Sequence, residues 1–151
     1  MTAKILDGRK LSTEIRADLA HRVETLSERG VVPTLAGILV GDDAGSAGYV
    51  RLKEKAAGEA GLRSEMAHLS QDVTQKDLLS RLAQLNERSD VHGIFVQLPL
   101  PPRFDEEAVL EAINPAKDVD GFHPLSVGRS WLGQPSFVPA TPAAVVEMLK
   151  R

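Results

Sequence analysis

The sequence alternates short apolar runs with longer amphipathic segments, and this alternation limits the possible folds. Two apolar runs, Thr34–Gly41 ("TLAGILVG") and Val91–Pro102 ("VHGIFVQLPLPP"), have strand length and end at glycine or proline, as buried strands do. Ser64–Leu69 ("SEMAHL") alternates as a strand does, which predicts that Met66 points inward. Strands separated by helices predict a mostly parallel sheet, in which ligands bind at the carboxyl ends of the strands.

Amphipathic stripes predict helices before, between and after these strands. The first helix is predicted to end near Gly30, on a stripe formed by Leu11, Ile15, Leu19, Val23 and Leu26. Further helices are predicted over residues 46–60, after the capping pair Thr74 and Asp77 with a stripe of four leucines behind it, over 104–113, and over 141–151. In the last of these, Thr141 is the expected cap and Pro142 the first helical residue.

Residues 125–139 are predicted to be irregular, because Gly128 and Gly133 interrupt them. Together these elements predict one three-layer αβα domain over residues 1–151.

Composition and charge exclude several classes of function. The chain has 151 residues, enough for one domain with a core, and a net charge of −3 without a basic cluster, which argues against a nucleic-acid partner. It has no cysteine, so disulfides and thiolate chemistry are excluded. No apolar run is long enough to cross a membrane, and the first residues lack a signal-peptide core. We therefore expect a cytoplasmic protein without a membrane partner.

The residues that follow the predicted strands are candidates for chemistry. Tyr49 and Lys53 are four residues apart, so on a helix they share one face, where a ring could stack on a flat ligand and an amine could move protons. The same spacing also occurs on ordinary amphipathic helices. Gln97 interrupts an apolar run and needs hydrogen-bond partners, which could be loop backbone, a ligand or a catalytic lysine.

Asp118 and Asp120 allow three interpretations. They could hold a metal ion, accept hydrogen bonds from a ring N–H and an exocyclic amine of a base-like ligand, or simply form an acidic turn before Gly121. The neighbouring Lys117 could neutralise the pair. The four histidines lack metal-ligand spacing, and "GDDAGSAG" matches neither the phosphate-loop nor the dinucleotide fingerprint, so we predict no metal and no nucleotide loop.

Four segments, taken in order, carry a resemblance to a known family. "SAGYVRLKEKAAGEAGL", "VHGIFVQLPLP", "PAKDVDGFHPLSVGR" and "FVPATP" closely resemble the amino-terminal catalytic domain of the bifunctional methylenetetrahydrofolate dehydrogenase/methenyltetrahydrofolate cyclohydrolase family. The family patterns S-x-x-Y-x-x-x-K, V-Q-L-P-L-P and P-x-K-D-V-D-G are all intact, and the resemblance covers nearly the whole chain. One departure is Ala140, where the family often has cysteine.

The resemblance implies roles for individual residues. Lys53 is expected to be the catalytic lysine that transfers protons, and Gln97 the glutamine that hydrogen-bonds to it and tunes it. Tyr49 is expected to stack on the folate, and Asp120 to anchor its pterin ring.

Three further residues of these motifs are expected to shape the site without taking part in the chemistry. Pro99 and Leu100 are expected to line the folate cleft, and Asp118 to order its loop.

The resemblance also implies an activity for the full-length enzyme. It would oxidise 5,10-methylenetetrahydrofolate with NADP or NAD and hydrolyse the 5,10-methenyl product to 10-formyltetrahydrofolate, as a homodimer in one-carbon metabolism that supplies purine biosynthesis. Family members continue into a Rossmann-like NAD(P) domain, which we expect to be absent from this chain. The chain is therefore expected to bind folate and at most to act as a cyclohydrolase. The alternatives are a folate-binding or interaction module without turnover, and a metal enzyme acting on phosphates through Asp118 and Asp120.

Overall fold

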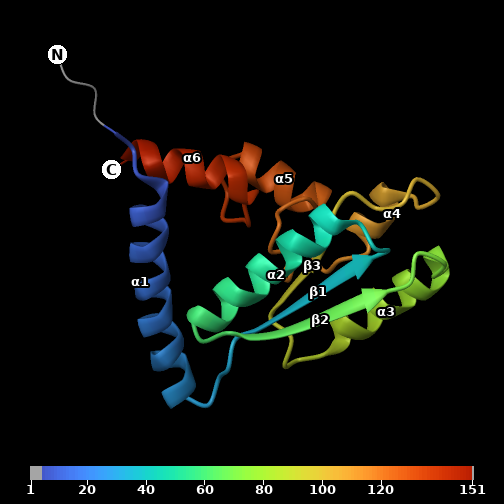
Figure 1. The fold of residues 1–151 in the computed structure, drawn as a ribbon, viewed down its shortest axis with the longest axis horizontal. Coiled ribbons are helices and arrows are strands. Elements are labelled where there is room, and N and C mark those ends of the chain that lie inside the picture. Colours follow the sequence, from blue (N-terminus) through green and yellow to red (C-terminus); the bar gives the residue numbers. More distant parts are fainter. Residues whose placement is uncertain (1–4, 151) are drawn as a thin grey trace.

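The computed structural model describes residues 5–150, which form a three-layer αβα domain (Figure 1). The described residues contain a three-stranded parallel sheet in the order β2-β1-β3. Its strands are β1 (Thr34–Val40), β2 (Arg63–Leu69) and β3 (Gly93–Val96). The predicted fold class is thus confirmed, and β1 is the central strand of the sheet.

Helices connect the strands and cover both faces of the sheet. In chain order they are α1 (Gly8–Glu28), α2 (Ala44–Glu59), α3 (Gln75–Glu87), α4 (Glu106–Glu111), α5 (Pro124–Trp131) and α6 (Ala140–Lys150). The predicted cap Thr74 does begin α3, because its hydroxyl accepts a hydrogen bond from the Asp77 amide at 3.1 Å. No helix among the described residues is long and apolar enough to cross a membrane.

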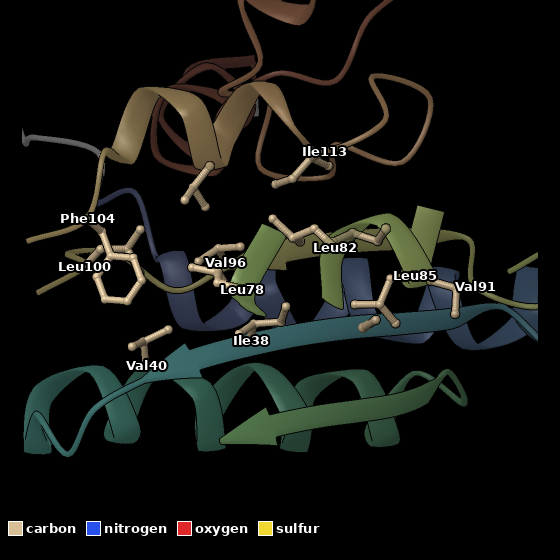
Figure 2. Packing of buried hydrophobic residues seen from close by; sticks show 13 residues of the cluster. Ile38, Val40, Leu78, Leu82, Leu85, Val91, Val96, Leu100, Phe104 and Ile113 are labelled. Carbon is tan, nitrogen blue, oxygen red and sulfur yellow. The ribbon is translucent and has the colours of Figure 1, made fainter. Parts of the chain in front are cut away.

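Successive residues of β1 serve two separate cores, because side chains alternate across a strand. One face of the sheet packs on α3 and α4 through the larger cluster, which includes Ile38, Val96, Leu78 and Leu82 (Figure 2). On the other face, Leu39 of β1 and Phe95 of β3 pack against Val50 of α2. The α2 face holds the candidate site, and the α3 face holds most of the buried apolar surface.

Three expectations about the elements are wrong in detail. Residues 124–131 form helix α5 instead of an irregular segment, because the ring Nδ1 of His123 accepts a hydrogen bond from the Leu125 amide at 3.0 Å and Pro124 suits the first helical position. Strand β3 ends at Val96, well before Pro102. Helix α6 begins at Ala140, so Thr141 lies inside it and does not cap it.

The ends of the chain differ from the prediction in two further respects. Residue 151, predicted as the end of the last helix, lies outside the described residues. The stripe on α1 is also less buried than predicted: Val23 is buried, whereas Leu26 is exposed. Figure 1 shows why, since α1 stands at the margin of the domain and its first turns lie close to the end of α6.

Candidate active site

Lys53 on α2 meets the loop that carries Asp120. The ammonium Nζ of Lys53 lies 3.5 Å from Oδ2 of Asp120, across 67 residues of sequence. It also lies 3.9 Å from the centroid of the Phe95 ring, at the end of β3. The side chains of Lys53 and Asp120 remain 36% and 23% exposed, so a ligand can reach both. A cation, a carboxylate and an aromatic face therefore converge at one accessible place.

Burial sets the electrostatics of Asp120. Loss of solvent raises the pKa of the Asp120 carboxyl above its ordinary value, the Lys53 ammonium opposes that rise, and the nearby Asp118 carboxylate adds to it. A carboxylate that is poorly solvated and only distantly paired gains much from new hydrogen-bond donors. Asp120 is thus suited to receive N–H groups from a ligand.

Asp118 holds the loop in shape. It is 1% exposed. Its Oδ2 accepts a hydrogen bond from the His123 amide at 2.9 Å, and its Oδ1 accepts one from the Phe122 amide at 3.3 Å. The expected loop-ordering role of Asp118 is confirmed. Each Asp118 oxygen thus carries one backbone hydrogen bond, and the described residues contain no group of three or more His, Asp, Glu or Cys side chains that could hold a metal ion.

Lys117 anchors the same loop to α3. Its Nζ donates to the backbone oxygens of Leu85, Asn86 and Arg88 at 3.2, 2.8 and 2.7 Å, at the end of that helix. The suggestion that Lys117 neutralises the aspartate pair is therefore wrong, because carbonyls at a helix C-terminus attract the cation instead. The Lys117 oxygen also accepts a hydrogen bond from the Ile94 amide at 2.7 Å, which ties the loop to β3.

Gln97 follows β3 directly and leaves one polar atom unsatisfied. Its side-chain Nε2 donates to the Leu98 oxygen at 2.7 Å, whereas its buried Oε1 has no hydrogen-bond partner within residues 5–150. A buried acceptor without a partner is unusual and marks a place where a donor can bind. The structure records no hydrogen bond between Gln97 and Lys53 among the described residues, so the tuning of the lysine by Gln97 stays a prediction.

The remaining expected site residues surround this cluster less closely. Tyr49 lies one helical turn before Lys53 on α2 and is 64% exposed, so its ring is accessible for stacking. Pro99 and Leu100 line a surface pocket of about 480 Å³ at the carboxyl end of β1, which Lys53 and Asp120 do not line. Leu100 is also part of the larger core, so most of its side chain supports the loop.

Phe95 is the site residue that sequence reasoning missed. The sequence pattern places Phe95 only within an apolar strand, yet its ring lies beneath the Lys53 ammonium. The signal was present, because residues two apart on a strand point to the same face and Phe95 stands two before Gln97.

The geometry and the motifs agree with what comparisons of the whole chain find. A family model described as tetrahydrofolate dehydrogenase/cyclohydrolase, catalytic domain, matches residues 6–120. The chain belongs to this family. The bifunctional protein FolD of Bacillus licheniformis is 51% identical over 151 residues, which is 100% of this chain and 53% of that relative. The chain spans about half the length of the curated relatives it matches.

Solved structures of family members superpose closely on the domain. The bifunctional FolD methylenetetrahydrofolate dehydrogenase/cyclohydrolase of Campylobacter jejuni has a TM-score of 0.96 and 44% identity, covering 97% of this chain and 52% of that one. The Trypanosoma brucei enzyme, solved with NADP cofactor and an inhibitor, has a TM-score of 0.94 and 39% identity, covering 99% and 52%. Both likenesses cover nearly the whole of this chain.

Proposed function

We propose that residues 1–151 form the folate-binding catalytic domain of an enzyme of one-carbon metabolism. The whole enzyme would oxidise 5,10-methylenetetrahydrofolate with NADP or NAD and hydrolyse 5,10-methenyltetrahydrofolate to 10-formyltetrahydrofolate. The observation that carries this proposal is the placement of Lys53 Nζ 3.5 Å from the half-buried carboxylate of Asp120, within intact family motifs.

The residues around Lys53 suit a pterin. A pterin ring presents a ring N–H beside an exocyclic amine, and the two oxygens of Asp120 can accept both. Tyr49 would stack on the flat ring system from α2, since its ring is largely exposed there. Oε1 of Gln97 is an unpaired acceptor for a donor of the ligand or for the Lys53 ammonium. Pro99 and Leu100 would line the part of the cleft beyond the carboxyl end of β1.

Hydrolysis of the methenyl group requires proton movement that Lys53 could provide. Water adds to the methenyl carbon and loses a first proton. The ring nitrogen then takes up a proton as its bond to that carbon breaks, and the second proton of the former water leaves as the formyl C=O forms, so one proton is released in total. An amine at Nζ can accept the first proton, and the ammonium can donate the one that the ring nitrogen takes up. Holding the folate beside Nζ would make these transfers intramolecular, which accelerates them.

The glycine-rich segment before α2 does not fit the pyrophosphate of a nicotinamide dinucleotide. The glycine-rich segment leads into α2, but the Asp43 carboxylate already caps that helix and accepts the Ser46 amide at 2.7 Å. A negative charge at the helix N-terminus repels pyrophosphate, which would otherwise bind there. We propose that NADP or NAD binds in the part of the longer relatives that this chain does not span.

The proposal also covers the location, the oligomeric state and the partners of the full-length enzyme. We expect the full-length enzyme to be a cytoplasmic homodimer that supplies purine biosynthesis, with folate as its partner and neither nucleic acid nor membrane bound. The chain alone would bind folate and at most hydrolyse the methenyl form.

Calorimetric titration with 5-formyltetrahydrofolate, a stable folate, tests the site. Asp120→Asn should weaken binding at least about tenfold, as expected for the loss of charge-assisted hydrogen bonds. Asp18→Asn is the matched control, because Asp18 lies on α1 and is exposed in a loose ion pair with Arg22. Equal binding by both variants, or no binding by the wild-type chain, would overturn the proposed site.

A further inference from the structure

We propose that Phe95 is a positioning residue whose ring face holds the Lys53 ammonium in the active site. The inference rests on the proposed function, because it concerns the same lysine. The Nζ of Lys53 lies 3.9 Å from the ring centroid, well inside the distance of about 6 Å over which a cation is attracted to an aromatic face. Phe95 itself is 1% exposed and fixed within β3, so the ring offers a rigid surface.

The ion pair with Asp120 is too long to fix the ammonium alone. A distance of 3.5 Å is at the outer limit of a hydrogen bond, and a lysine stem has four flexible carbons. In the proposed function the Asp120 oxygens also accept hydrogen bonds from the pterin. Their interaction with the Lys53 ammonium is therefore weaker when folate is bound. The contact with the ring does not compete with the ligand for hydrogen bonds, so it persists when folate binds.

The centre of the sheet is built to accept this ring. Gly37 of β1 pairs with Phe95 in the parallel register. A β carbon at Gly37 would lie 2.5 and 2.7 Å from Cζ and Cε1 of the ring, and 2.5 Å from Sδ of Met66. Glycine inside a strand weakens it, and it often marks a place where another group approaches the backbone closely. Here the missing side chain of Gly37 makes room for the ring that faces Lys53.

A ring that only fills the core would behave differently from one that positions Lys53. Phe95→Leu keeps an apolar side chain but removes the aromatic face, and it leaves space above Gly37. The double variant Gly37→Ala/Phe95→Leu refills that space with a methyl group, from which the flexible end of the Met66 side chain, at 2.5 Å, has to shift. If Phe95 only fills the core, the double variant recovers every property of the wild type. If Phe95 positions Lys53, the double variant recovers stability and nothing else.

The position of Lys53 can be measured directly by NMR on the chain with ¹³C-labelled lysine. Protons over a ring face are shifted upfield, so the ε-methylene of Lys53 should resonate upfield of that of Lys55, which is exposed and pairs with Glu59 at 3.8 Å. The upfield shift should vanish in Phe95→Leu and in the double variant. An ordinary shift for Lys53 in the wild type, or an unchanged shift in folded Phe95→Leu, would overturn the proposal.

The rate of methenyltetrahydrofolate hydrolysis supplies the functional readout. Loss of the ring face should lower kcat about twofold to tenfold in Phe95→Leu and in the double variant, with KM nearly unchanged, because the pterin contacts remain. Full recovery of kcat in the double variant would overturn the positioning role. If the wild-type chain does not hydrolyse the substrate, the chain has no turnover by itself. The NMR shift still decides whether the ring holds Lys53, and the folate titration separately decides whether the proposed site binds folate.

Discussion

Replacing Gln97 with methionine should make the ligand-free chain more stable and a poorer folate binder. Methionine has nearly the shape of glutamine, but it carries no carbonyl oxygen. An unpaired buried acceptor such as Oε1 costs about 1–3 kcal/mol, whereas the lost bond from Nε2 to the Leu98 oxygen contributes about 0.5–1.5 kcal/mol. The difference predicts that Gln97→Met raises the free energy of unfolding by about 1 kcal/mol.

Urea denaturation of the ligand-free protein measures this difference. Gln84→Met is the matched control. Gln84 is exposed on α3, and within residues 5–150 its side chain only accepts a bond from Arg81, so the change in stability should stay within about 0.5 kcal/mol. Affinity for 5-formyltetrahydrofolate should fall in Gln97→Met and not in Gln84→Met. The reasoning is refuted if Gln97→Met lowers stability by more than about 1 kcal/mol, which would mean that Oε1 is satisfied in the folded chain.

Three further substitutions test other parts of the structure. Because burial raises the pKa of Asp120 from 3.8, its protonation favours folding at low pH, and this contribution is lost as the pH rises from about 4 through the raised value. The stability of the wild type relative to Asp120→Asn should therefore decline over that range in urea titrations at successive pH values, and a constant difference would contradict the shift. Lys117→Met should cost about 1–3 kcal/mol and weaken folate binding, because three carbonyls at the end of α3 lose their donor; a loss in neither measurement would show that the anchor is dispensable. Leu82→Ala, at a side chain with no exposure, should cost about 2–5 kcal/mol yet leave the affinity of the folded protein unchanged, since Leu82 packs on the far face of the sheet.

The local sequence was sufficient to predict features, such as helix ends, that depend on residues close together in the chain. The cap at Thr74 and the end of α2 before Gly61, which has a φ of 80°, both depend on residues a few positions away. Helix α5 was missed because Gly128 suggested a break, whereas the cap by His123 and the fixed φ of Pro124 favour a helix despite the glycine. When one residue favours a helix and another opposes it, as here, the local sequence does not show which effect prevails, and the tertiary structure is needed.

The residues of the site could be predicted from the sequence, but the contacts between them could not. Spacing alone placed Tyr49 and Lys53 on one helical face. The meeting of Lys53 with Asp120 spans 67 residues, so it could be expected only from the family resemblance. The role of Lys117 depends on the end of α3 lying beside the loop, which no nearby residue specifies. The contact with Phe95 depends on the packing of α2 over β3, and on a glycine in the neighbouring strand.

The most direct test of the central claim is the decay of methenyltetrahydrofolate absorbance with the 151-residue chain, corrected for the buffer rate. Lys53→Met is compared with Lys55→Met, which removes an equal charge from a 74% exposed side chain on the same helix. We predict that the wild type and Lys55→Met accelerate the decay and that Lys53→Met does not. If Lys53→Met is as fast as the wild type, Lys53 is not the proton carrier. If no protein exceeds the buffer rate, the chain does not catalyse the hydrolysis by itself.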